Sequence, residues 1–136
     1  MIFHLDTNAV IAILNRNERA RTRFADAGAA NVAVSPIVFF ELHYVIAKSL
    51  KRQTNDAALE VMFMNGCTML EFGHGEARIA GQIRASLETK GVVLGSFDLL
   101  IAAHALHARA TLVTNDKAFS RVPGLVVEDW TKPKKR

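Results

Sequence analysis

Ile2-Phe3-His4-Leu5-Asp6-Thr7-Asn8-Ala9-Val10-Ile11-Ala12-Ile13-Leu14, residues 2–14, is the stretch of sequence from which the fold can be predicted. It begins with a short apolar run that ends at Asp6 and continues with an apolar segment from Ala9 to Leu14. Between the two, Asp6-Thr7-Asn8 supplies side chains that commonly cap helices. Residues 2–14 therefore predict a β-strand, a tight turn and an α-helix.

The same alternation of strand and helix continues along the chain. Short apolar runs predict further strands at 31–34, 68–72, 111–114 and 125–127. Capping residues and helical spacing predict helices from Ser35-Pro36 to about residue 50, and over 54–64, 76–90 and 99–109. Strands that alternate with helices favour a parallel sheet covered on both faces. We expect an α/β protein, a three-layer α/β/α sandwich with about five parallel strands.

Length and composition bound the class of protein. The chain has 136 residues, of which 50% are hydrophobic, so it can bury one good core. No apolar run approaches the roughly 18 residues of a membrane span, and Met1 to Asp6 does not resemble a signal peptide. The single cysteine, Cys67, is typical of a small core side chain in a reducing compartment. We expect a soluble, cytoplasmic protein without a membrane partner.

Four acidic residues are candidate functional residues, although each also has a structural explanation. Asp6 and Asp98 can cap helices, and Asp116 can be a turn residue. Glu41 lies among apolar residues, with no lysine or arginine at helical spacing, so burying it is costly unless a cation arrives from elsewhere. The alternative for Glu41 is a partly exposed helix face.

Taken together, these carboxylates predict a metal site. Asp6 and Asp116 follow strands, and open parallel sheets bind ligands at the carboxyl ends of their strands. Two carboxylates about 4 Å apart repel by roughly 4 kcal/mol at an effective dielectric near 20, and a divalent cation removes that repulsion. Hard oxygen ligands favour Mg²⁺ or Mn²⁺. Such an ion activates water for phosphodiester hydrolysis.

Four ordered motifs now identify a family. The chain resembles the PIN-domain nucleases over essentially its whole length, and among them the VapC-type toxins of bacterial toxin–antitoxin pairs. The motifs are Leu5-Asp6-Thr7-Asn8, Ser35-Pro36-Ile37-Val38-Phe39-Phe40-Glu41-Leu42, Asp98-Leu99-Leu100-Ile101-Ala102-Ala103 and Leu112-Val113-Thr114-Asn115-Asp116-Lys117-Ala118-Phe119. The resemblance implies a PIN-like nuclease domain over residues 1–131, followed by a basic C-terminal tail at 132–136.

The resemblance also implies an activity and its residues. The protein would be a metal-dependent endoribonuclease (a hydrolase of the EC 3.1 class) that cuts single-stranded RNA. Its targets could include the loops of tRNA or of another structured RNA. Its partners would be a VapB-like antitoxin and a second copy of itself in a homodimer. The implied catalytic and metal-binding residues are Asp6, Glu41, Asp98 and Asp116, with Thr7 and Thr114 in supporting positions and Asn115 as the alternative to Asp116.

Basic residues outside these motifs are candidates for RNA contacts. Lysine and arginine outnumber aspartate and glutamate by 17 to 13, which attracts polyanions. A solvated basic surface is the alternative explanation. The candidates are Arg16, Arg19, Arg23, Lys134, Lys135 and Arg136.

Three other functions remain open at this point. A Mg²⁺-dependent phosphatase or phosphoryl-transfer domain could use an acidic cluster, although the second aspartate expected two residues after the first is replaced by Asn8. A non-catalytic RNA-binding module would explain the basic residues without requiring turnover. Metal-free cleavage would need a converging histidine pair, for which His104 and His107 are the nearest candidates.

Overall fold

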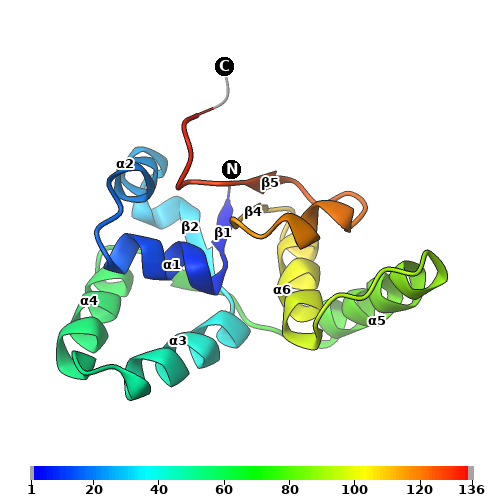
Figure 1. Cartoon of the computed structure of the whole chain (residues 1–136), viewed down its shortest axis with the longest axis horizontal. Coiled ribbons are helices and arrows are strands. Elements are labelled where there is room, and N and C mark those ends of the chain that lie inside the picture. The colour runs from blue at the N-terminus through cyan, green and yellow to red at the C-terminus, as the bar shows by residue number, and fades with distance from the viewer. Residues whose placement is uncertain (1, 135–136) are drawn as a thin grey trace.

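The computed structural model describes residues 2–134 and has one parallel β-sheet at its centre (Figure 1). Within those residues the sheet has five strands in the order β3-β2-β1-β4-β5, and every pairing is parallel. The strands are β1 (Phe3–Leu5), β2 (Val32–Val34), β3 (Thr68–Met69), β4 (Thr111–Val113) and β5 (Val127–Glu128). The predicted five-stranded parallel sheet is confirmed.

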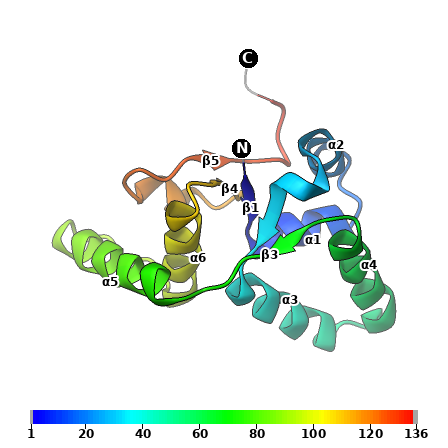
Figure 2. The ribbon, with the colours of Figure 1, turned by 180° about the vertical axis from the view of Figure 1, so that it is seen from behind.

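Helices cover both faces of this sheet (Figures 1 and 2). The α-helices are α1 (Thr7–Leu14), α2 (Glu18–Ala27), α3 (Pro36–Lys48), α4 (Arg52–Met64), α5 (His74–Thr89) and α6 (Ser96–His107), and the short 3₁₀ helices are η1 (Ala29–Asn31) and η2 (Lys117–Arg121). Helices α1–α4 lie on one side of the strands, and α5 and α6 lie on the other. Right-handed crossovers explain this division, because the chain steps one way from β1 to β3 and returns the other way to β4. The α/β/α sandwich is confirmed.

Some element boundaries differ from the sequence prediction. The strand predicted at 68–72 ends at Met69, because its neighbour β2 ends at Val34, the partner of Met69. The last strand is displaced toward Glu128, where it pairs with Val113 of β4. The arginine-rich segment is helix α2, capped by Asn17 and ended by Gly28 at φ +83°. Each difference reflects a tertiary partner or a cap rather than local hydrophobicity.

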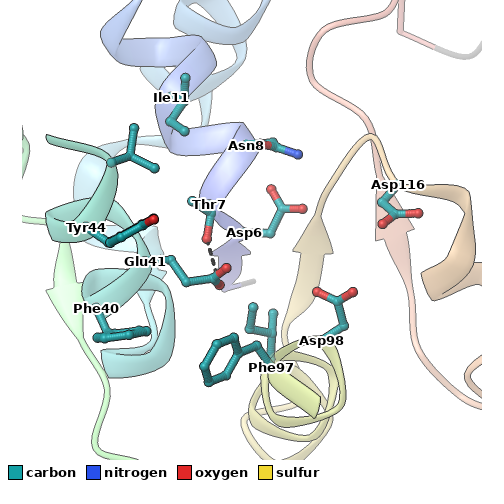
Figure 3. A pocket seen from close by; sticks show the side chains of 12 residues that line it. Asp6, Thr7, Asn8, Ile11, Phe40, Glu41, Tyr44, Phe97, Asp98 and Asp116 are labelled. Atoms are coloured by element: carbon teal, nitrogen blue, oxygen red, sulfur yellow. Dashed lines mark hydrogen bonds between the residues drawn. The ribbon is translucent and has the colours of Figure 1, made fainter. Parts of the chain in front are cut away.

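Helix α6 brings its first turn to the carboxyl edge of the sheet. It is apolar on nearly all sides, and Ala102, Ala103 and Ala105 are fully buried. These small residues allow close packing of α6 in the core. As a result, the first turn of α6 lies near the point where β1 ends (Figure 3).

Among residues 2–134, no helix combines the length and apolar character that crossing a membrane requires.

Candidate active site

The four candidate carboxylates meet at one cavity of about 540 Å³ (Figure 3). They come from separate parts of the chain. Asp6 follows β1, Glu41 lies in α3, Asp98 lies in the first turn of α6, and Asp116 follows β4. The fold therefore brings together residues that are 110 positions apart in the sequence, and we call them the acidic cluster.

Asp6 is the most buried member of the acidic cluster, with 5% of its surface exposed. One oxygen, Oδ1, accepts a hydrogen bond of 2.8 Å from the Ala9 backbone N–H and so caps α1. Burial raises the pKa of Asp6 to about 6, although hydrogen bonds from Thr114 and Ala9 oppose the shift and the charges of Asp98 and Asp116 add to it. Asp6 therefore caps a helix and lines the cavity at once, so the two explanations do not exclude each other.

Glu41 is directed into the cavity by a contact from another helix. The Thr7 hydroxyl of α1 donates a 3.0 Å hydrogen bond to Glu41 Oε1. Of the two explanations that the sequence leaves open for Glu41, the structure shows the partly exposed helix face. Glu41 is half-buried, and Phe40 and Tyr44 beside it are 58% and 59% exposed. The open cavity, rather than a buried ion pair, accommodates the charge.

Asp98 and Asp116 complete the acidic cluster from the other side (Figure 3). Asp98 makes no capping hydrogen bond in α6. Burial raises its pKa, and the charges of Asp116 and Glu41 raise it further. Asp116 is exposed and caps η2 by accepting a 2.9 Å hydrogen bond from the Ala118 N–H. Asn115, its sequence neighbour, lines a second cavity beside η2 and β5 and not the acidic one.

The chemistry of the cluster fits a divalent cation. None of the described residues that line the cavity is a lysine or arginine, so no protein cation balances the four acids. Within residues 2–134, however, no three acidic, histidine or cysteine side chains lie close enough together to enclose a metal by themselves. Mg²⁺ commonly keeps several waters and binds one or two carboxylates. A partly hydrated ion therefore suits this looser set of oxygens.

The cavity also has an aromatic wall, formed beside Glu41 and Asp98, that was not anticipated from the sequence (Figure 3). The rings of Phe40 and Phe97 pack with centroids 5.6 Å apart, and Tyr44 lies beside them. One signal was available, because Phe40 and Phe97 directly precede two of the candidate carboxylates, Glu41 and Asp98. The cavity thus combines acidic oxygens with flat apolar surfaces.

The basic residues considered as RNA contacts lie outside this cavity. Arg16 and Arg19 are exposed, whereas the Arg23 guanidinium forms an ion pair with Glu128 of β5 and is largely covered. Lys134 lines the second cavity, together with Asn115. The other two candidates, Lys135 and Arg136, lie outside the described residues.

Histidine and cysteine chemistry finds no support in the geometry. His104 is buried against His4 and Phe72, and His107 Nδ1 lies 2.8 Å from Glu76 Oε1 on α5. None of these histidines lines the acidic cavity. Burial raises the pKa of the Cys67 thiol to about 11, which disfavours the reactive thiolate.

Comparison with known proteins agrees with the fold. The PIN domain family matches residues 4–125, so the chain belongs to the PIN-domain family. Within it, the chain is 38% identical over 135 residues to "Ribonuclease VapC2" of Rickettsia felis, covering 97% of this chain and 100% of that protein. It is also 38% identical over 130 residues to "tRNA(fMet)-specific endonuclease VapC" of Salmonella typhimurium, covering 94% and 97% of the two chains.

Solved structures show the same similarity. One chain of the Rickettsia felis VapBC2 structure, bound to a DNA fragment from its promoter, superposes with a TM-score of 0.86 at 36% identity. The alignment covers 96% of this chain and 99% of that one. DNA-bound VapBC from Salmonella typhimurium gives a TM-score of 0.85 at 36% identity, with 96% and 98% coverage. Both chains share the fold over nearly their full lengths.

Proposed function

We propose that this protein is a Mg²⁺- or Mn²⁺-dependent endoribonuclease and the toxin of a toxin–antitoxin pair. One observation carries the proposal: four carboxylates from distant parts of a PIN-domain chain line a single cavity that contains no basic side chain among the described residues. Full-length relatives with the name ribonuclease or endonuclease support the same activity.

The residues of the acidic cluster divide the work of binding and orientation. When bound, a divalent cation supplies an activated water and neutralises the charge that develops on the phosphate. Asp6, after β1, and Asp98, in the first turn of α6, both present carboxylate oxygens to the cavity (Figure 3). The Thr7 hydroxyl fixes the orientation of Glu41, and Thr114 Oγ1 accepts the Asp116 N–H at 3.0 Å.

We assign the fourth position of the site to Asp116 rather than to Asn115. Asp116 lines the acidic cavity, and its charge raises the pKa of Asp98. Asn115 lines only the second cavity. A carboxylate is also the better ligand for a hard divalent cation than a neutral amide.

The substrate we propose is tRNA, cut in a single-stranded loop in the cytoplasm. The Salmonella typhimurium relative bears the name of a tRNA(fMet)-specific endonuclease, which supports initiator tRNA as the first substrate to test. Unpaired bases stack readily on aromatic side chains. Phe40 and Phe97, both half-exposed at the cavity, offer such surfaces beside the acidic cluster.

The partners we propose are a VapB-like antitoxin and a second copy of this chain. Structural neighbours include complexes named VapBC, and one of them is described as a member of the VapBC family of toxin–antitoxin systems. A small DNA-binding protein encoded by the neighbouring upstream reading frame is the expected antitoxin. Its co-expression should relieve growth arrest caused by this chain, and it should co-purify with it.

Cleavage of initiator tRNA by the purified protein tests the activity. We expect discrete fragments with Mg²⁺ or Mn²⁺, no cleavage in EDTA, and recovery when Mn²⁺ is added in excess. Asp98→Asn should lower kcat by about 10³-fold or more, because it removes one charge of the metal site. Asp26→Asn, a matched change on the exposed face of α2, should leave the rate unchanged.

Each alternative function predicts a different result. Cleavage that persists in EDTA, or an Asp98→Asn variant as active as Asp26→Asn, would contradict the metal mechanism. RNA binding without cleavage under either metal would favour a binding module. Metal-dependent release of phosphate from p-nitrophenyl phosphate, with intact RNA, would favour a phosphatase.

A further inference from the structure

A second cavity, of about 620 Å³, adjoins the acidic cavity. It is formed by the turn after β4, by η2, by β5 and by the segment at 132–134. Asp116 lines both cavities, so the second begins at the residue where the first ends. A chain molecule bound at the acidic cluster can therefore continue into it.

The second cavity carries the basic groups that the acidic cavity lacks. Lys117, Lys132 and Lys134 line it, and within residues 2–134 none of them forms an ion pair. Arg23 and Glu128 also line it, but they neutralise each other in an ion pair. Apart from the shared Asp116, the acid that remains is Asp129, so the lysines leave an excess of positive charge.

The second cavity also differs from the acidic cavity in its lack of aromatic side chains. No aromatic residue is among the described residues that line it, whereas the acidic cavity has Phe40, Tyr44 and Phe97. Exposed lysines neutralise backbone phosphates, and aromatic rings stack on bases. The amide of Asn115 also lines the second cavity and adds a neutral hydrogen-bonding group. The second cavity is thus suited to the backbone of a nucleic acid rather than to its bases.

We propose that the second cavity is a phosphate-binding subsite, in which Lys117 and Lys132 hold the RNA backbone next to the scissile bond. The inference rests on the proposed ribonuclease function and adds the path of the strand. Bases would lie toward the aromatic wall, and the backbone would pass Asp116 toward the lysines. The subsite supplies the attraction for a polyanion that four carboxylates cannot supply.

The test compares two double variants with the same loss of charge. Lys117→Gln with Lys132→Gln removes the subsite, and Lys51→Gln with Lys90→Gln removes two exposed lysines on loops elsewhere. Both are made in the Asp98→Asn background, so that labelled initiator tRNA is bound without being cut. The dissociation constant is measured by fluorescence anisotropy at several salt concentrations. Melting temperatures confirm that the variants are folded.

We expect the subsite variant to bind about tenfold more weakly than the control variant. The plot of log affinity against log salt concentration should become less steep by roughly 1.4, because the variant loses two phosphate contacts and each contributes about 0.7 for a single strand. When the two lysine substitutions are made in the active protein, with Asp98 intact, KM should rise by a similar factor while kcat stays unchanged. Arginine at both positions should restore affinity, since it keeps the charge.

The opposite results would overturn the proposal. These are equal affinities and equal salt slopes for the two double variants, or a fall in kcat with KM unchanged. Loss of antitoxin binding with unchanged tRNA affinity would assign the cavity to a protein partner instead. If the wild-type protein cleaves no RNA, the proposed function fails by itself, and the affinity comparison still decides whether the lysines bind RNA.

Discussion

The segment formed by β1 and the residue after it, and helix α6, each contribute one residue to two clusters of ionisable groups. Asp6 and Asp98 belong to the acidic cluster at the carboxyl edge of the sheet. His4 of β1 and His104 of α6 form a buried pair with ring centroids 4.7 Å apart. Within the described structure, both nitrogens of His4 lack a hydrogen-bond partner.

The two clusters respond to burial in opposite ways. Burial raises the pKa of Asp6 to about 6 and lowers that of His4 to about 3, since both shifts favour the neutral form. The acidic cluster opens into a cavity that a cation can enter, whereas the histidine pair is sealed in the core. Closely spaced ionisable residues thus indicate a functional site only where a ligand can reach them.

Replacement of His4 should have the largest effect on stability. Between pH 6.5 and 3 the unfolded chain takes up a proton that folded His4 does not, so acid lowers the free energy of unfolding. A shift from 6.5 to about 3 corresponds to roughly 5 kcal/mol. His4→Leu should remove most of this acid sensitivity in urea unfolding measured from pH 7 to pH 4.

The exposed His74 provides the matched control for this experiment. His74→Leu should leave the pH dependence of unfolding unchanged, and both variants should keep the cleavage activity of the wild type. An unchanged acid sensitivity in His4→Leu would contradict the neutral, buried state of His4.

Asp6 should change the pH dependence of the free energy of unfolding in the opposite direction to His4. Its folded pKa of about 6 lies above the reference value of 3.8, so the free energy of unfolding falls as pH rises between those values. In EDTA at pH 7.5, Asp6→Asn should therefore be more stable than the wild type by up to about 3 kcal/mol. Asparagine also caps helices well, so α1 keeps its cap.

Added Mg²⁺ sharpens the comparison. It should stabilise the wild type against urea and leave Asp6→Asn unaffected, because binding to the folded state alone raises stability. A variant that is less stable than the wild type in EDTA, or equally stabilised by Mg²⁺, would show that Asp6 serves mainly to cap α1.

Loss of the Thr7 hydroxyl should have the smallest effect. Thr7→Val removes the hydrogen bond that orients Glu41, at nearly constant volume. We expect cleavage to fall about tenfold, which corresponds to about 1.4 kcal/mol, with little change in stability. Thr22→Val on the exposed side of α2 is the control, and equal rates for the two variants would remove Thr7 from the site.

Much of the fold could be predicted because its signals are local. The capping residue Asp6 after an apolar run and the Ser35-Pro36 helix start specify where elements begin. The lengths of the strands could be predicted less well from the sequence. The edge strand β3 ends where β2 offers no further partner, which its own residues do not encode.

The candidate site was predictable in its members but not in its arrangement. Asp6, Glu41, Asp98 and Asp116 could be selected by residue type and motif, while their meeting at one cavity depends on the packing of α6 and α3 against the sheet. The choice of Asp116 over Asn115 depends on a turn that places Asp116 at both cavities and Asn115 at the second one. The position of Phe97 beside Phe40 likewise requires two helices to meet.

The sequence by itself determined the order of strands and helices, the helix caps and the four acidic residues, because these follow from periodicity and side-chain chemistry over short distances. The tertiary structure alone decided which ionisable groups share an open cavity, which are sealed in the core, and which lysines lie beside Asp116. Burial and charge–charge interaction depend on distances in space, and in this chain those distances join residues that are far apart in the sequence.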